Sequence, residues 1–269
     1  MSQGGLFDES HAPDPALFDE LPLWSSLAGQ LLLEHVPLTA RRALDLGCGA
    51  GFPLLELAER LGPGSLVAGV DPWFSALRRA RQKREAWRVP HAHVVAGDGA
   101  RLPFRDAAFE LIVVNLGVNN FDDPDAVFAE CRRVLEPGAS LALTSNVTGH
   151  MRQLYDAFER VLAGDAAALE RLRANVAHRG SAASLAARLE AARFRIAATH
   201  TREVPMRYAS GRALLEHHFV RFGFRPDWEV VAGSREAIAR LEKELDRNAA
   251  SAGELRLTVP LVYIEARVG

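Results

Sequence analysis

A carboxylate and three closely spaced glycines form the most informative stretch of the sequence, ALDLGCGAGFP. Asp45 ends an apolar run and is followed at alternate positions by Gly47, Gly49 and Gly51. A dinucleotide-binding turn spaces its glycines as G-x-G-x-x-G, so that backbone N–H groups hold a pyrophosphate. The third position of that pattern falls on Phe52 here, and a carboxylate would repel a pyrophosphate. The residues therefore favour a ligand that carries positive charge, such as an ammonium or sulfonium group.

Polar residues also end three further apolar runs. Asp71, Asp98 and Asn115 each follow a segment rich in valine, alanine or isoleucine, as Asp45 does. In a parallel sheet, ligands bind beyond the carboxyl ends of the strands, near the point where the strand order reverses. We therefore expect four polar side chains to line one edge of a sheet.

Alternating strands and helices must position these side chains, and the apolar periodicity predicts them. Strands are expected at residues 43–46, 65–71, 92–98, 109–117 and 140–146. Helices are expected at residues 23–35, 52–62, 74–87 and 125–135, after a polar arm at residues 1–20. This alternation predicts an α/β fold with a parallel sheet and helices on both faces.

The composition limits the partners and the compartment. The chain has 269 residues, a formal net charge of −2 and a pI of about 6.5, so nucleic acid is a poor candidate partner. The two cysteines, Cys48 and Cys131, lack metal-binding spacing. The first residues lack the features of a signal peptide, and no apolar run is long enough to predict a membrane span. We expect a cytoplasmic protein, and the sequence leaves its oligomeric state open.

The stretch from Asp45 to Gly51 resembles motif I, D-x-G-x-G-x-G, of class I S-adenosylmethionine-dependent methyltransferases. The segment VAGVDPW resembles the strand end whose acidic residue binds both ribose hydroxyls of the cofactor, a role that falls on Asp71. The segment AGDGARLPF resembles the one whose aspartate accepts from the adenine amine. That aspartate is Asp98 here, with the Gly99 backbone close to the ring.

The resemblance covers residues 40–146 and is closest to the branch that contains quinone-biosynthesis and other small-molecule methyltransferases. In NLGVNNF, Asn115 and Leu116 would approach the methionine part of the cofactor, and Pro137 and Gly138 would make the turn into the fifth strand. The resemblance implies a Rossmann-like sheet of seven strands, mostly parallel with an antiparallel final strand, and helical cap additions. The implied S-adenosylmethionine-binding residues are Asp45, Gly47, Cys48, Gly49, Gly51, Asp71, Pro72, Trp73, Asp98, Gly99, Asn115 and Leu116.

The second half of the chain is expected to complete the same domain on the substrate side. We expect an N-terminal arm and cap helix at 1–38, the cofactor-binding core at 39–149, and helical insertions with strands six and seven at 150–269. The expected helices are 151–162, 166–176, 181–192 and 235–247, and the expected strands are 194–206 and 255–267. The added helices are expected to form part of a lid over the methyl acceptor.

No general base is identified by the sequence, and two adjacent histidines are candidates. His218 shares a helical face with Leu214, Leu215 and Phe222, which predicts a buried, hydrogen-bonded core histidine. His217 lies at the edge of that face. A role as catalytic base stays open for both.

Four other side chains have simple structural interpretations. His150 and Tyr155 follow the fifth strand closely enough to reach the site, but a helix start and core packing also explain them. His91 and His93 share one strand face without a third ligand nearby, so no metal site is predicted. The basic run at residues 78–84 is interpreted as a solvated helix face rather than a nucleic-acid contact.

The sequence therefore predicts methyl transfer from S-adenosylmethionine to a small organic acceptor, which would leave S-adenosylhomocysteine. Two alternatives stay open. The first is an RNA or protein methyltransferase, which the charge balance disfavours. The second is a non-catalytic scaffold that binds the same cofactor. The acceptor and its methylated atom are not indicated by any motif.

Overall fold

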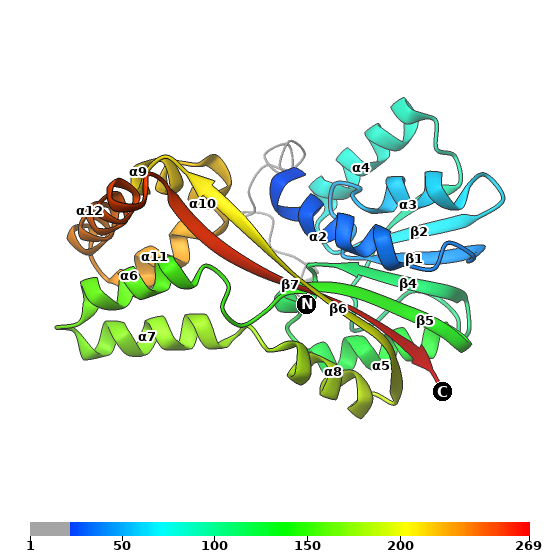
Figure 1. The fold of residues 1–269 in the computed structure, drawn as a ribbon. Helices are drawn as coiled ribbons and strands as arrows, with labels where there is room; N and C mark the ends of the chain where they lie inside the picture. The colour runs from blue at the N-terminus through cyan, green and yellow to red at the C-terminus, as the bar shows by residue number, and fades with distance from the viewer. Residues whose placement is uncertain (1–21) are drawn as a thin grey trace, which may run out of the picture. The chain divides into compact units, whose positions relative to one another are not determined.

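In the computed structural model, which describes residues 22–269, a seven-stranded sheet has the order β3-β2-β1-β4-β5-β7-β6 (Figure 1). Six strands run parallel and the final strand, β7, is antiparallel. The strands are β1 (Arg42–Leu46), β2 (Leu66–Asp71), β3 (Ala92–Ala96), β4 (Phe109–Asn115), β5 (Leu135–Asn146), β6 (Phe194–Tyr208) and β7 (Leu255–Val268). The predicted Rossmann-like α/β fold is confirmed. The expected N-terminal arm lies outside the described residues.

The chain divides into two compact units. Within the described residues, unit 1 comprises segments 22–145, 182–201 and 262–269, and unit 2 comprises segments 146–181 and 202–261. Strands β6 and β7 each contribute residues to both units.

Unit 1 contains the core of the sheet and its flanking helices. Helices α3 and α4 lie on one side of the sheet, and α5 and α8 lie on the other (Figure 1). The helices of unit 1 are α2 (Pro22–His35), α3 (Leu54–Leu61), α4 (Phe74–Trp87), α5 (Pro124–Val134), α8 (Ala182–Ala191) and the 3-10 helix η1 (Val118–Asn120). Helix α4 has the predicted bounds.

The central strands align the residues of interest at one edge. β1 pairs in parallel with β2 and β4, so Asp45 lies opposite Gly69 of β2 and Val113 of β4. Asp71 lies opposite Ala96 of β3. The apolar side chains of β1 and β4, and those of β2 after Leu66, are almost fully buried, which gives the loops at the carboxyl ends of these three strands a rigid base.

Local sequence explains where the helices begin and end. Asp123 caps α5 by accepting the N–H of Ala126 at 3.0 Å, and Pro124 occupies its first turn. Helix α3 ends at Gly62, whose φ of 80° is easily adopted only without a side chain. Helix α4 ends at Arg88, which has a left-handed conformation.

The turn that was expected before the fifth strand lies inside β5. The pairing between β4 and β5 jumps from Leu135 to Ser140, and Gly138 within that gap has a φ of 77°. The strand therefore starts earlier than residue 140, and the predicted turn residues form an irregular excursion within it.

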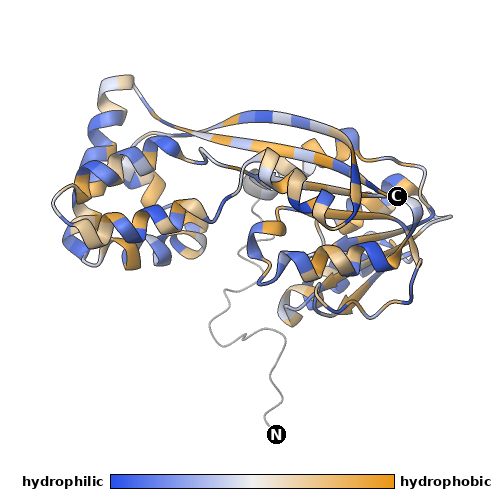
Figure 2. Cartoon of the chain, turned by 90° about the horizontal axis from the view of Figure 1, so that it is seen from below, coloured by the Kyte–Doolittle hydropathy of each residue, from blue (hydrophilic) through white to orange (hydrophobic). Residues whose placement is uncertain are grey.

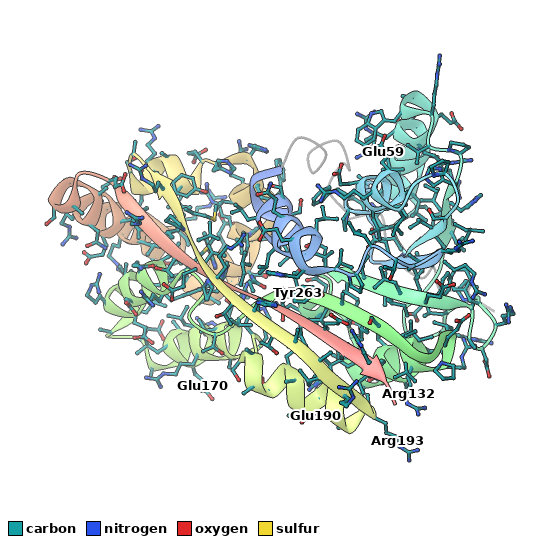
Figure 3. The ribbon with its side chains drawn as sticks, turned by 45° about the vertical axis from the view of Figure 1, so that its right-hand side comes forward. Glu59, Arg132, Glu170, Glu190, Arg193 and Tyr263 are labelled. Carbon is teal, nitrogen blue, oxygen red and sulfur yellow. The ribbon has the colours of Figure 1, made fainter. Side chains whose placement is uncertain are left out.

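Helix α2 is fixed to the last strands within unit 1 by three aromatic rings. The imidazoles of His35 and His200 stack with centroids 3.8 Å apart and planes inclined by 6°. Tyr263 of β7, labelled in Figure 3, has its ring centroid 5.4 Å from that of His35. The predicted first helix is confirmed, and these rings attach its end to β6 and β7.

Unit 2 is helical. Hydrophobic and hydrophilic residues alternate along its helices in Figure 2, as expected for amphipathic elements that pack on one another. Leu154, Tyr155 and Phe158 of α6 are buried, as expected for the apolar face of an amphipathic helix. The helices of unit 2 are α6 (Arg152–Leu162), α7 (Ala166–Ala177), α9 (Gly211–Leu215), α10 (His218–Gly223), α11 (Arg225–Ala232) and α12 (Arg235–Ala252).

The interpretation of His218 as a buried core histidine is wrong. The helical face expected to join Leu214 to Phe222 is interrupted after Leu215, and a new helix, α10, begins at His218. Because the break rotates the following residues, His218 is exposed and His217 is half-buried at the helix N-cap. The apolar face predicted from a continuous helix therefore does not exist at these positions.

Candidate functional site

The glycine loop joins β1 to α3 through three residues with positive φ. Gly47, Gly49 and Gly51 have φ values of 79°, 48° and 102°. The N–H of Gly47 donates to the carbonyl of Val70 at 2.8 Å, which holds the loop against the end of β2. A side chain on Gly51 would come within 3.2 Å of Cβ of Ala80, so this glycine allows α4 to pack closely.

The first two glycines of the loop face open space. A Cβ at Gly47 or at Gly49 would meet no described atom within 4 Å. Their glycine identity is therefore explained by the backbone conformation and not by a neighbouring protein group. A loop of this kind leaves its backbone accessible to a bound molecule.

Asp45 is a buried carboxylate below this loop. Its side chain is fully buried, and neither of its oxygens has a hydrogen-bond partner among residues 22–269. Burial raises the pKa of Asp45 to about 8, and the negative charge of Asp71 adds to the shift. The backbone of Leu54 opposes the shift, although its geometry falls short of a hydrogen bond. A cation is the ligand that would best satisfy such a group.

Asp71 binds the glycine loop directly. One carboxylate oxygen accepts the N–H of Gly49 at 2.9 Å, and the other accepts the N–H of Trp73 at 2.9 Å. Burial raises the pKa of Asp71, and these two hydrogen bonds oppose the shift. Each carboxylate oxygen has a second acceptor position, so the side chain retains two acceptors for a ligand diol.

Asp98 and Gly99 follow β3 at the same edge. Asp98 is exposed, and its carboxylate accepts the N–H of Ala100 at 2.9 Å. A Cβ at Gly99 would lie 3.3 Å from Cδ1 of Leu46 and 3.4 Å from Cγ2 of Val127. Gly99 therefore brings this loop close to the end of β1, while the Asp98 carboxylate stays open to solvent.

Asn115 and Leu116 end β4. The Asn115 amide donates to the carbonyl of Ser25 in α2 at 3.1 Å and accepts from the hydroxyl of Thr144 at 2.8 Å. The N–H of Leu116 donates to the carbonyl of Thr144 at 3.0 Å, and Leu116 has a φ of 61°. Asn115 thus connects α2, β4 and β5, a structural role that its position in the sequence did not reveal.

The remaining predicted residues contribute to this edge in different ways. The thiol of Cys48 is free and fully buried, so this residue can offer a ligand only its backbone. Burial also raises the pKa of the thiol well above its usual range. Pro72 and Trp73 are half-buried at the end of β2. The structure therefore gathers the predicted residues of β1, β2, β3 and β4 at neighbouring strand ends.

Two further glycines that shape the site were missed in the sequence. A Cβ at Gly69 of β2 would lie 2.6 Å from Cδ2 of Leu54 and 2.7 Å from Sγ of Cys48. A Cβ at Gly29 of α2 would lie 2.3 Å from the ring of Phe52. A glycine inside a strand or helix is a signal of close approach, and that signal was present at both positions.

No described group provides a metal site. Within residues 22–269, histidine, cysteine, aspartate and glutamate side chains do not gather in threes around a point where an ion would bind. His91 hydrogen-bonds the carbonyl of Ala58 at 2.8 Å, and His93 is exposed. Among the described helices, none combines the length and the apolar character needed to cross a membrane.

The fold and this site define the class of protein. A mostly parallel sheet of this strand order, with a D-x-G-x-G-x-G loop and acidic residues at successive strand ends, is the arrangement of a Rossmann-like, nucleoside-binding domain. Residues 44–143 match the family model described as a methyltransferase domain.

Curated relatives agree with this match. The chain is 29% identical over 239 residues to nocamycin O-methyltransferase of Saccharothrix syringae, covering 84% of each chain. It is 38% identical over 120 residues to demethylmenaquinone methyltransferase of Thermus thermophilus. That match covers 45% of this chain, and the chain spans about half (52%) of the relative.

A solved structure shares the fold. The S-adenosylmethionine-dependent methyltransferase of Aquifex aeolicus superposes with a TM-score of 0.55 at 20% identity, over 70% of this chain and 92% of that one. Together, the family match, the relatives and the fold show that residues 44–143 form a methyltransferase domain of Rossmann-like fold, and that the chain is an enzyme of this type.

Proposed function

We propose that the chain transfers the methyl group of S-adenosylmethionine to a nucleophilic atom of a small organic acceptor, leaving S-adenosylhomocysteine. The observation that carries this proposal is the carboxylate of Asp45, fully buried without a hydrogen-bond partner in the described chain, below a glycine loop that is open to a ligand. The relatives whose names include nocamycin and demethylmenaquinone support a small-molecule acceptor.

The residues at the strand ends suit the parts of this cofactor. We assign Asp45 to the positive charge of its methionine part and the two open acceptor positions of Asp71 to its ribose diol. Asp98 and the backbone of Gly99 are assigned to the adenine, with Pro72 and Trp73 beside it. The backbones of the glycine loop, including Cys48, and of Asn115 and Leu116 would complete the site.

The cofactor, when bound, supplies a methyl group made electrophilic by the sulfonium, together with a neutral leaving group. The contribution of the protein is then alignment. Holding an acceptor atom in line at a contact distance contributes on the order of 7 to 11 kcal/mol. A general base would add about 10² to 10⁴-fold where the acceptor must lose a proton, and we assign this role to no residue.

We propose that residues 150–269, with the helices of unit 2, select the acceptor, while the cofactor core lies in residues 39–149. A cytoplasmic location is also proposed. Both cysteines are free and buried, which fits a reducing compartment. Replacing helices α6 and α7 with those of a relative of different specificity should change the accepted substrates and leave cofactor affinity unchanged.

The test combines cofactor calorimetry with a screen for S-adenosylhomocysteine release over phenols, quinones, amines and carboxylates. We expect the wild type to turn over one of these classes of acceptor. Asp71→Ala should lose this activity, and Glu59→Ala should keep it. Glu59 is exposed on α3 and serves as the matched control (Figure 3). Tight cofactor binding without turnover on any acceptor would favour the scaffold, and salt-sensitive RNA retention would favour an RNA methyltransferase.

A further inference from the structure

Hydrogen bonds to the backbone hold one arginine of unit 2, Arg179, in place. Arg179 lies in the segment between α7 and α8, and its carbonyl accepts the hydroxyl of Thr148 at 3.1 Å. The N–H of Thr148 donates to the carbonyl of Gly180 at 3.0 Å. These two bonds fix the position from which the Arg179 side chain extends.

Two of the three guanidinium nitrogens of Arg179 lack a hydrogen-bond acceptor within the described chain. Its Nε and Nη1 atoms are buried, and within the described part of the chain neither has a hydrogen-bond partner. Burial lowers the pKa of Arg179, while Tyr155 and Asp227 oppose the shift, yet no carboxylate of residues 22–269 lies within ion-pair distance. A guanidinium offers five N–H donors, so leaving two of them buried and unpaired costs free energy. Such an arrangement calls for an anion from outside the described residues.

Other polar groups are buried close to this guanidinium. The Tyr155 hydroxyl is buried and also lacks a partner with hydrogen-bond geometry among residues 22–269. Burial lowers the pKa of His150 well below its usual range, and the positive charge of Arg179 lowers it further. His150 is therefore neutral at pH 7, so Arg179 provides the positive charge and Tyr155 a neutral donor.

The surroundings are aromatic. The ring of Phe224 stacks on His150 with centroids 6.1 Å apart. Trp228, almost fully buried, and Phe219 contact Phe224 at centroid distances of 5.7 Å and 5.4 Å. Aromatic walls beside a charged fork favour an organic anion with an apolar body over a free inorganic ion.

We propose that Arg179 and the Tyr155 hydroxyl bind the carboxylate of a small organic acid within unit 2. The guanidinium fork matches the two oxygens of a carboxylate, and Tyr155 adds a third donor. This inference goes beyond methyl transfer, because it concerns binding by unit 2 whether the acid is the acceptor or an effector.

The experiment uses benzoate as the probe and benzamide as its neutral counterpart. Titration of the full chain, with ¹⁵N-labelled arginine, is followed through the Nε–H resonances and by thermal shift. Benzoate should raise the melting temperature and move the Arg179 resonance, and benzamide should do neither. Arg179→Met should bind benzoate about 10 to 100 times more weakly, because a hydrogen-bonded charge is lost. Arg173→Met, which alters an exposed arginine of α7, should bind normally.

A stability measurement separates binding from a structural role. Without ligand, Arg179→Met should melt at a temperature equal to or above that of the wild type, because it removes a buried charge that lacks a partner. Retained S-adenosylmethionine binding shows that the variant is folded and keeps this test independent of the cofactor site. Tyr155→Phe should weaken benzoate binding while leaving the fold intact.

Three outcomes would overturn the proposal: no benzoate binding by the wild type, equal binding by Arg179→Met, or equal effects of benzoate and benzamide. Should Arg179→Met fail to fold, the movement of the Arg179 resonance in the wild type still decides. Methylation of the bound acid identifies it as the acceptor, and binding without methylation identifies it as an effector.

Discussion

The carboxylate of Asp71 accepts the backbone N–H of Gly49 at 2.9 Å, although the two residues are 22 positions apart. One side chain therefore fixes the conformation of the glycine loop and retains acceptor positions for a ligand. Preorganisation of this kind reduces the entropy that a ligand would lose in ordering the loop.

Replacing Asp71 should reduce both stability and cofactor affinity. Asp71→Ala removes two hydrogen bonds from backbone N–H groups to a carboxylate, each worth about 1.5 to 3 kcal/mol. The free energy of unfolding should fall by at least the lower figure, and affinity for S-adenosylmethionine should fall at least about tenfold. Chemical denaturation and calorimetry measure the two effects.

Asp98→Ala serves as the matched comparison. Asp98 is exposed, and among residues 22–269 its carboxylate accepts just the nearby N–H of Ala100. We expect a loss of cofactor affinity with a change in stability below about 0.5 kcal/mol. Unchanged affinity in both variants would remove the assignment of the two carboxylates to the cofactor.

Cofactor affinity should increase with pH. Free Asp45 has a pKa of about 8, and a bound cation would lower it, so binding releases a proton. Affinity should therefore rise by up to about tenfold per pH unit below about pH 8 and level off above it. Calorimetry in buffers of different ionisation enthalpy measures the released proton, and Asp45→Asn should abolish both effects.

The same carboxyl predicts the pH dependence of stability without cofactor. The pKa of Asp45 is raised from 3.8 to about 8, so the folded state holds this proton more tightly than the unfolded state. The resulting contribution to the free energy of unfolding is fully present below about pH 4 and is lost as the pH rises to 8. His150, whose pKa is lowered, acts in the opposite direction. The informative quantity is therefore the difference in unfolding free energy between the wild type and Asp45→Asn. A difference that is constant from pH 4 to 8 would contradict this account.

An alanine at position 69 should disturb the glycine loop. Its Cβ would lie within 2.7 Å of both Leu54 and Cys48, so Gly69→Ala should cost about 1 to 3 kcal/mol of unfolding free energy. Gly64→Ala is the control, because a Cβ there meets nothing within 4 Å and the backbone does not have positive φ. Thermal melts of both variants measure the contrast, and equal melting temperatures would contradict the packing described here.

A glycine at position 88 should stabilise the C-terminal end of α4. Arg88 is exposed and has a φ of 58°, a conformation that costs a residue with a side chain about 1 kcal/mol or more. Arg88→Gly should therefore raise the free energy of unfolding by about that amount. Arg78→Gly, in the middle of the same helix, should lower it by about 1 kcal/mol. A decrease in both variants would show that the side chain of Arg88 stabilises the fold.

Much of the fold follows from local sequence signals. The bounds of α4 and the ends of β1 and β2 were predictable, because apolar periodicity and glycine stops act over a few residues. The break at His217 was not predictable, because no proline or glycine marks it. Periodicity alone therefore extended the helix and placed His218 on a face that the structure lacks.

The candidate site was predictable in type but not in its contacts. The motif indicated Asp45, Asp71 and Asp98 as ligand-binding residues, and this role stays a proposal for each of them. The bonds from Asn115 to Ser25 and Thr144 depend on the packing of α2 beside β4, which no local pattern encodes. Long-range pairing decides which polar groups remain open to a ligand.

The chain passes between the two units four times, at 145/146, 181/182, 201/202 and 261/262. A single proteolytic cut therefore cannot release either unit as one fragment, because any cut leaves pieces of at least one unit on both products. Limited digestion followed by mass spectrometry should yield nicked protein that stays associated. A gene segment that encodes only one unit would have to be assembled from separate stretches.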